Sequence, residues 1–251
     1  MISGALMTFT PLETLFFLDV ITAGVGITIV LWLVKVPLSF HEREDIKPII
    51  YFSEVKAGLN YIKSQKYILR LMIVMTVFCF MLAPASFLTP LQVARNFGDD
   101  VWRLSVLEIV FAVGLILGGL WISLWGGFRN RVHTIALSLF CMGTFVASLG
   151  VVTIFWLYLL FMALIGVFGP IFNTPTIVLL QTNVEPAYLG RVFSLFTMIK
   201  SVAFPLGMLL FGPLADFISL NVIMIISGLI MSLLFIPLLT SKHVVKAGEK
   251  R

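Results

Sequence analysis

Charged residues are scarce in this chain. Only 12% of its 251 residues are Asp, Glu, Lys or Arg, whereas 60% are hydrophobic, and the mean hydropathy is +1.08. A soluble protein with a single membrane anchor would carry far more charge outside that anchor. The composition therefore places the whole chain in the membrane class.

The residues and motifs that serve catalysis, metal binding or ATP hydrolysis are also few. The two cysteines, Cys79 and Cys141, both fall in apolar stretches, so neither a disulfide framework nor a metal cluster is indicated. None of the three histidines belongs to a His-Glu-x-x-His motif, and no Gly-x-Ser-x-Gly occurs, which argues against an intramembrane enzyme. The sequence also lacks a phosphate-binding Gly-x-x-x-x-Gly-Lys-Ser/Thr loop, which excludes an ATP-driven motor within this chain. We expect no cofactor.

What the chain has in quantity is long apolar stretches. Each holds about 20 residues, the number that an α-helix needs to cross ~30 Å of hydrocarbon at 1.5 Å per residue. The sequence therefore predicts an all-α membrane protein with seven transmembrane helices. The predicted spans are Leu15–Val36, Ile68–Pro90, Ser105–Trp125, Thr134–Thr153, Ile154–Thr182, Val192–Phe217 and Leu220–Thr240.

The basic residues between the spans predict an orientation. Gaps that would share one side of the membrane hold 14 Lys and Arg residues, whereas the alternate gaps hold only Arg95 and Arg103. Because Lys and Arg next to short loops stay on the cytoplasmic side, we expect an external amino end and a cytoplasmic carboxyl end in the cell membrane. The net charge of +5 then follows from topology, and no nucleic-acid partner is expected.

The first residues of the chain look like a second copy of the approach to its last span. At a constant offset of 208, identical residues pair as Gly4 with Gly212, Leu6 with Leu214, Phe9 with Phe217 and Leu12 with Leu220. Chance similarity between apolar helices is one explanation. The other is a transporter built from two parallel repeats of six spans. On the second explanation the first span here is the sixth of twelve, and Met1 is expected to be internal to a longer protein.

Four segments follow from these patterns. Residues 1–37 form the tail of a missing helix and the first span, 38–67 a cytoplasmic linker, 68–240 a bundle of six helices and 241–251 a cytoplasmic tail. Within the linker, helical spacing places Phe52, Val55, Leu59 and Ile62 on one apolar face. An amphipathic helix of this kind is expected to lie along the membrane surface.

Several stretches together resemble a known family. They are Pro11–Asp19, Leu104–Glu108 running into Gly114 and Gly118, Glu185–Ser194 and Phe204–Asp216. These stretches are similar to the major facilitator superfamily, in particular to its drug and siderophore exporters, but only to the carboxyl-terminal half of a member. The resemblance implies proton-driven efflux of amphipathic molecules such as macrolides, drugs or siderophores by alternating access. It also implies membrane lipid, a small-molecule substrate, protons and an amino-terminal half as partners.

One family feature is altered. The loop between the family's spans eight and nine often pairs an Asp with basic residues, but here Leu124–Arg131 contains Arg129 and Arg131 without an Asp. These two arginines, and Arg191 in the later loop, are predicted to make contacts on the cytoplasmic side. A helix carboxyl end would attract such cations.

Three ionisable residues within spans need an explanation, because a charge in hydrocarbon costs at least ~2.5 kcal/mol. Glu108 is either a protonatable coupling site or an interfacial carboxylate that pairs with Arg103 or Arg95. Lys200 either reaches the headgroup layer with its long stem or provides a counter-charge in a cavity. Asp19 is most simply a residue at the start of a helix, where the dipole favours an acid, although a coupling role is the alternative.

Polar residues in the fifth span suggest a substrate site. Asn173 and Gln181 lie near prolines that remove backbone hydrogen bonds and permit bending, and broken polar helices are where transporter cavities tend to lie. The resemblance implies that the second, third, fifth and sixth spans line the cavity, which adds Phe80 and Phe204 as substrate contacts. The alternative is that these polar groups join helices.

Other functional classes stay open at this point. The chain could be a truncated membrane fragment without transport activity, or a half-transporter that needs a separately made amino-terminal half. A seven-helix receptor fits the number of spans alone.

Overall fold

The computed structural model describes residues 12–33, 50–98 and 100–249, and every regular element among them is an α-helix. The chain divides into two units, Met1–Ile50 and Tyr51–Arg251. In the first unit, α2 (Leu12–Leu33) overlaps the first predicted span. It contains a shorter apolar stretch at Val20–Ile29. The matching copy at Gly4, Leu6 and Phe9 lies outside the described residues, so the repeat stays a prediction.

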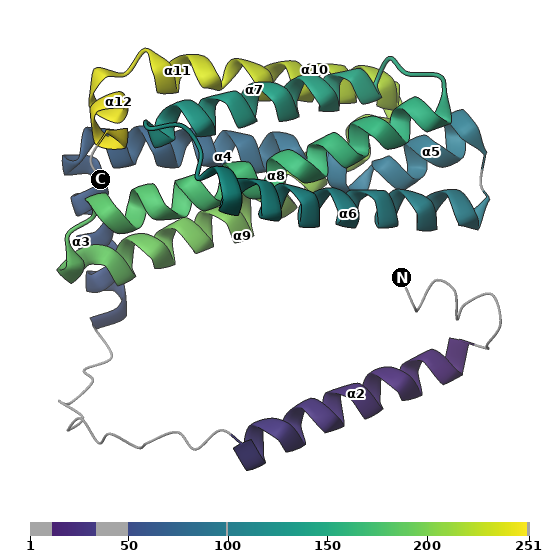
Figure 1. Ribbon diagram of the computed structural model, residues 1–251, viewed down its shortest axis with the longest axis horizontal. Coiled ribbons are helices and arrows are strands. Elements are labelled where there is room, and N and C mark those ends of the chain that lie inside the picture. The colour runs from purple at the N-terminus through teal and green to yellow at the C-terminus, as the bar shows by residue number, and fades with distance from the viewer. Residues whose placement is uncertain (1–11, 34–49, 99, 250–251) are drawn as a thin grey trace. The chain divides into compact units, whose positions relative to one another are not determined.

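The second unit is a helical bundle. Its helices are α3 (Ile50–Ser64), α4 (Lys66–Phe87), α5 (Thr89–Phe97), α6 (Val101–Trp125), α7 (Arg131–Leu149), α8 (Phe155–Asn183), α9 (Pro186–Phe217), α10 (Leu220–Leu233), α11 (Phe235–Leu239) and α12 (Lys242–Gly248). Among the described residues, six helical segments are long and apolar enough to cross a membrane. They coincide with the last six predicted spans, which confirms the all-α membrane fold (Figure 1).

Prolines interrupt two of the six spans. Pro90 stands in the first turn of α5, where its missing N–H costs nothing, and α4 ends three residues earlier at Phe87. Pro237 lies in the short helix α11, which follows the end of α10 at Leu233. Span two is therefore α4 with α5, and span seven is α10 with α11.

Glycines set the spacing of two helix pairs. On α6, a Cβ at Gly114 or Gly118 would collide with the backbone of Ala163 or Val167 on α8. Gly143 of α7 packs against α10 and Gly228 of α10 packs against α7 in the same way. A Cβ at Gly143, for example, would meet the backbone of Ser232. Small residues of this kind let membrane helices approach backbone to backbone.

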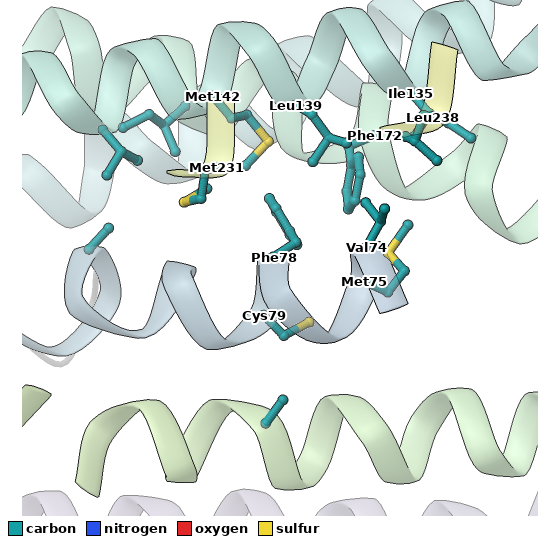
Figure 2. Close-up of a cluster of buried hydrophobic side chains, with 14 of the residues drawn as sticks. Val74, Met75, Phe78, Cys79, Ile135, Leu139, Met142, Phe172, Met231 and Leu238 are labelled. Atoms are coloured by element: carbon teal, nitrogen blue, oxygen red, sulfur yellow. The ribbon is translucent and has the colours of Figure 1, made fainter. Parts of the chain in front are cut away.

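The pair α4 and α9 is joined similarly. Gly207 of α9 leaves no room for a side chain, because a Cβ there would lie 2.6 Å from the Ala83 Cβ and 2.7 Å from the carbonyl oxygen of Phe80. The core lies where α4, α7, α8 and α10 meet. Figure 2 shows Phe78 pointing from α4 toward the side chains of Leu139 and Met142 on α7. Buried apolar contact of this kind fixes the helices that carry the cavities described below.

Basic side chains gather at one end of the bundle, which we call the basic end. Here α4 and α9 begin, α6 and α8 end, and α3 and α12 pack (Figure 1). Tyr67 donates a hydrogen bond to the carbonyl oxygen of Asn183 at 2.6 Å, and Asn130 donates one to the carbonyl oxygen of Val245 at 2.9 Å. The described basic residues at this end are Lys56, Lys63, Lys66, Arg70, Arg129, Arg131, Arg191, Lys242 and Lys246.

The helix α3 packs on the start of α9. Gly58 is buried beneath Leu195 and Arg191 of α9, and the ring of Tyr61 stacks on that of Tyr188 with 4.3 Å between centroids. Ile62, from the predicted apolar face, is also buried. Val55 and Leu59, the other two described members of that face, are exposed. The predicted contact of this face with the membrane surface therefore stays a prediction. The side chain of Phe52 lies outside the described residues.

A buried polar cluster joins four helices at the opposite end. Gln92 of α5 is fully buried and donates to the carbonyl oxygen of Leu149 and to Oδ1 of Asn221, both at 3.0 Å. The side-chain amide oxygen of Gln92, Oε1, accepts a hydrogen bond from the hydroxyl of Tyr158 at 3.0 Å. Buried amides are stable only when satisfied in this way, so the cluster fixes the relative positions of α5, α7, α8 and α10.

Candidate functional site

One cavity of the bundle is a groove between α4, α8 and α9, which we call the Lys200 groove. Its volume is about 720 Å³, within the range of small-molecule sites. Its lining is mostly aromatic and aliphatic, and Lys200 is the one charged residue in it. The lining residues are Met75, Phe78, Cys79, Leu82, Phe172, Asn173, Ile177, Phe193, Phe196, Thr197, Lys200, Ser201, Phe204 and Pro205.

Helical spacing on α9 gathers the polar part of this lining. Thr197, Lys200, Ser201 and Phe204 stand at positions i, i+3, i+4 and i+7 of the helix, which places them on one face. The Lys200 ammonium lies 5.4 Å from the centre of the Phe196 ring, a cation–π contact. Lys200 thus places an exposed ammonium group in the lining of an aromatic groove, and a cavity role for it stays a prediction.

A second cavity, which we call the Glu108 chamber, lies between α4, α5, α6, α7 and α8. It has a volume of about 360 Å³, and Glu108 is the one charged residue in its lining. Arg103, considered above as a partner for Glu108, instead forms an ion pair with Asp100 at 3.1 Å. Arg95 is exposed, and the described part of the chain has no Glu108 ion pair with either arginine. Glu108 thus lines the chamber with an exposed side chain, and its role as a coupling site stays a prediction.

The two cavities share a wall. Phe78 and Leu82 of α4 and Phe172 and Asn173 of α8 line both of them. The rings of Phe78 and Phe172 lie 4.4 Å apart between centroids, so their contact separates the two cavities. Asn173 is exposed on this wall and offers both a donor and an acceptor. The Lys200 groove and the Glu108 chamber thus adjoin across the ring pair of Phe78 and Phe172 and the amide of Asn173.

Of the predicted substrate contacts, Asn173 and Phe204 line the Lys200 groove, whereas Phe80 and Gln181 line neither cavity. Phe80 packs in the α4–α9 contact, where its ring lies 5.6 Å from that of Phe211. Gln181 is exposed near the end of α8. Asp19 belongs to α2, but its side chain lies outside the described residues.

The predicted loop contacts lie at the basic end. Arg131 donates to the hydroxyl of Thr182 at 3.0 Å, in the last turn of α8, where a helix dipole favours a cation. Arg191 forms an ion pair with Glu54 of α3 at 3.3 Å. Arg129 is exposed beside a surface pocket. In this half, therefore, Arg131 contacts a hydroxyl group near a helix end, and Arg191 contacts a carboxylate of α3.

Sequence reasoning missed several groove residues. Thr197 and Ser201 flank Lys200, and Cys79 faces them from α4. The signal for the first two was present, because residues three and four apart on a helix share a face with Lys200. No comparable signal marked Cys79, since its place depends on how α4 packs against α9.

The sequence profile of the Major Facilitator Superfamily matches residues 1–208 of the chain. The chain belongs to the Major Facilitator Superfamily. Its described helices and this membership identify it as a multi-pass membrane protein.

Two similar proteins are macrolide efflux proteins by name. The chain is 29% identical over 229 residues to macrolide efflux protein A of Streptococcus pyogenes, which covers 90% of this chain and 56% of that protein. It is also 29% identical over 209 residues to macrolide efflux protein A of Enterococcus faecalis, covering 82% of this chain and 64% of that protein. The chain thus spans 56% and 64% of the length of these two relatives. No solved structure matches it.

Proposed function

We propose that this chain forms one bundle of a secondary active exporter that moves amphipathic small molecules, such as macrolides, other drugs or siderophores, out of the cell. The observation that carries the proposal is the Lys200 groove, which is large, aromatic and singly charged. Apolar walls with a few placed polar groups suit amphipathic ligands. The similarity to two macrolide efflux proteins supports the same direction of transport.

Proton coupling is assigned to Glu108. It stands in a helix long and apolar enough to span the membrane and lines a mostly apolar chamber, and ionisable residues within membrane spans mark proton pathways in pumps and transporters. Taking up and releasing a proton there would change the charge next to the shared wall of the two cavities. Such a change can favour one of the two conformations in alternating access.

An amino-terminal half is proposed as the partner that completes the cavity. The Lys200 groove is bounded by three helices on one side, and a two-bundle transporter places its site between the bundles. Ile116 and Leu120 of α6 and Leu206 and Leu210 of α9 are exposed apolar residues, so both helices have surface for lipid or for that half. We further propose that the basic end faces the cytoplasm of the cell membrane, as the distribution of Lys and Arg predicts.

Drug accumulation tests the proposal directly. Cells with the intact gene should accumulate less of a radiolabelled macrolide, fluorescent dye or catecholate siderophore than cells from which it has been deleted. Collapsing the proton gradient should abolish this difference. The four conditions are cells with and without the gene, each before and after the proton gradient is collapsed. Equal accumulation of every compound in all four would refute export.

Two substitutions connect the test to the cavities. Lys200→Gln should reduce efflux of the transported compound, whereas Lys63→Gln, which removes an exposed lysine of α3, should leave efflux unchanged. Glu108→Gln cannot release a proton, so its residual transport should no longer respond to the proton gradient. If Glu108→Gln retains full gradient dependence, another residue couples transport to protons.

A specific observation favours one alternative. Because the chain spans 56% of the Streptococcus pyogenes protein, it is also suited to being an inactive fragment or a half that requires separate assembly. Co-expression with an amino-terminal half distinguishes an inactive fragment from a half that requires assembly, since only the latter would gain efflux activity.

A further inference from the structure

A third cavity, distinct from the two described above, opens at the basic end where α3 meets α4, α8 and α12. Its volume is about 460 Å³. We name it the interfacial pocket, and its lining residues are Tyr61, Ser64, Gln65, Lys66, Tyr67, Asn183, Glu185, His243, Lys246 and Ala247. We propose that this pocket binds the phosphate headgroup of an anionic phospholipid.

The position of the pocket puts it at the level of the headgroups. Lys66 is the first residue of one membrane-spanning helix, Asn183 is the last residue of another, and Glu185 directly precedes a third that starts at Pro186. Three span ends that meet at one pocket mark the boundary between hydrocarbon and water. Tyr61 and Tyr67 add two phenol rings, which favour this boundary.

The charge of the lining suits a phosphate diester. Lys66 and Lys246 contribute two positive charges against the single carboxylate of Glu185. Both lysines are exposed, and among the described residues the ion pairs formed, Arg103–Asp100 and Arg191–Glu54, involve neither of them. Their ammonium groups are therefore available to an external anion.

Most of the other polar groups in the lining already have protein partners, which keeps the pocket in shape. The Tyr67 hydroxyl donates to the carbonyl oxygen of Asn183 at 2.6 Å, and the Tyr61 hydroxyl accepts from the backbone N–H of Glu185 at 3.3 Å. These two bonds tie α4 to the last residue of α8, and α3 to the segment between α8 and α9. Lys66 of α4 and Lys246 of α12 line the same pocket, and α12 is held by the hydrogen bond from Asn130 to the carbonyl oxygen of Val245.

The surface beside the pocket favours a lipid over a free phosphate. Arg70 and Ile73 follow Lys66 at intervals of four and three residues, so all three lie on one face of α4. Arg70 is exposed, and Ile73 is 55% exposed. A lipid whose phosphate contacts Lys66 therefore finds a further cation and then apolar surface along the same helix, which a soluble phosphate would not use.

Binding of short-chain lipids to the purified chain in detergent tests the proposal without any transport measurement. A ligand of the folded state raises the melting temperature as its concentration rises. Dioctanoyl-phosphatidylglycerol should do so at lower concentration than dioctanoyl-phosphatidylcholine or glycerol 3-phosphate. Equal affinity for the choline lipid would overturn the headgroup assignment, and equal affinity for glycerol 3-phosphate would make this a site for soluble phosphates.

Two pairs of substitutions locate the site. Replacing Lys66 and Lys246 by Gln should weaken binding of the anionic lipid about 25-fold, at roughly fivefold for each basic residue near a membrane surface, and replacing both by Arg should preserve binding. Replacing Lys63 and Lys242 by Gln removes the same charge from neighbouring exposed positions outside the lining. If the control variant loses as much affinity for the anionic lipid as the Lys66 and Lys246 variant, the pocket assignment is overturned. The lipid would then be attracted by the overall positive charge of the basic end.

Discussion

The contact between α6 and α8 gives a sharp prediction for a single methyl group. Gly118 of α6 is buried against the backbone of Val167, and a Cβ there would overlap the carbonyl oxygen and Cα of that residue. Gly119, the next residue, has no neighbouring atom within 4 Å of a Cβ. The substitutions Gly118→Ala and Gly119→Ala therefore add the same methyl group to the same helix, one into a contact and one into open space.

The magnitude follows from the difference between the two variants. Replacing Gly by Ala within a helix stabilises it by up to about 1 kcal/mol, and this gain is common to both. Overpacking a close contact costs about 1–3 kcal/mol, and only Gly118→Ala incurs it. Gly118→Ala should thus have a free energy of unfolding about 1–3 kcal/mol below that of Gly119→Ala, or a melting temperature lower by about 2–4 °C for each kcal/mol.

Thermal unfolding of the purified chain in detergent, followed by circular dichroism, measures this difference. A second substitution sharpens the test: Val167→Ala should not rescue Gly118→Ala, because the overlapping atoms belong to the backbone of α8 and persist when the side chain is shortened. Equal melting temperatures for the two glycine variants, or full rescue by Val167→Ala, would refute backbone contact between α6 and α8.

Three further predictions concern stability and accessibility. Gln92→Leu should cost about 2–3 kcal/mol in unfolding free energy, because it removes three hydrogen bonds and leaves buried partners unsatisfied, while Asn96→Ala, which loses one exposed bond, should cost at most about 1 kcal/mol by denaturant titration. Arg191→Gln should change stability by less than about 1 kcal/mol, since its ion pair is partly exposed, and a larger loss would show that α3 depends on that pair. In a Cys141→Ser background, maleimide should label Cys79 more slowly when a transported compound is bound, since Cys79 lines the Lys200 groove, and unchanged labelling would place the compound elsewhere.

The spans and their order could be predicted because hydropathy is a local property of the sequence. Apolar length marked six helices, and the remaining differences lie at their ends. The α9 helix, for example, begins at Pro186, although its apolar part begins at Val192. Glu108 and Lys200 could also be singled out, since a charge within a span is rare and costly.

Side-chain partners could not be predicted, because they depend on the rotation of each helix about its axis. Phe80 and Phe204 were both expected to contact substrate, yet only Phe204 lines the groove, while Phe80 packs against Phe211. The cluster around Gln92 was likewise invisible, since its members are as far apart as 129 residues along the chain. Pairing Arg103 with Glu108 was plausible by proximity in sequence, but Asp100 lies three residues away on the same helical turn.

The glycine contacts determine where the bundle can deform. Gly114 and Gly118 join α6 to α8, and Gly207 joins α9 to α4, so each pair lacks the layer of side chains that would let one helix slide along the other. Glu108 and Asn173 therefore travel together on one pair, while Lys200 travels with the other. We expect a change in the width of the groove to involve shear between these two pairs, along the ring contact of Phe78 with Phe172.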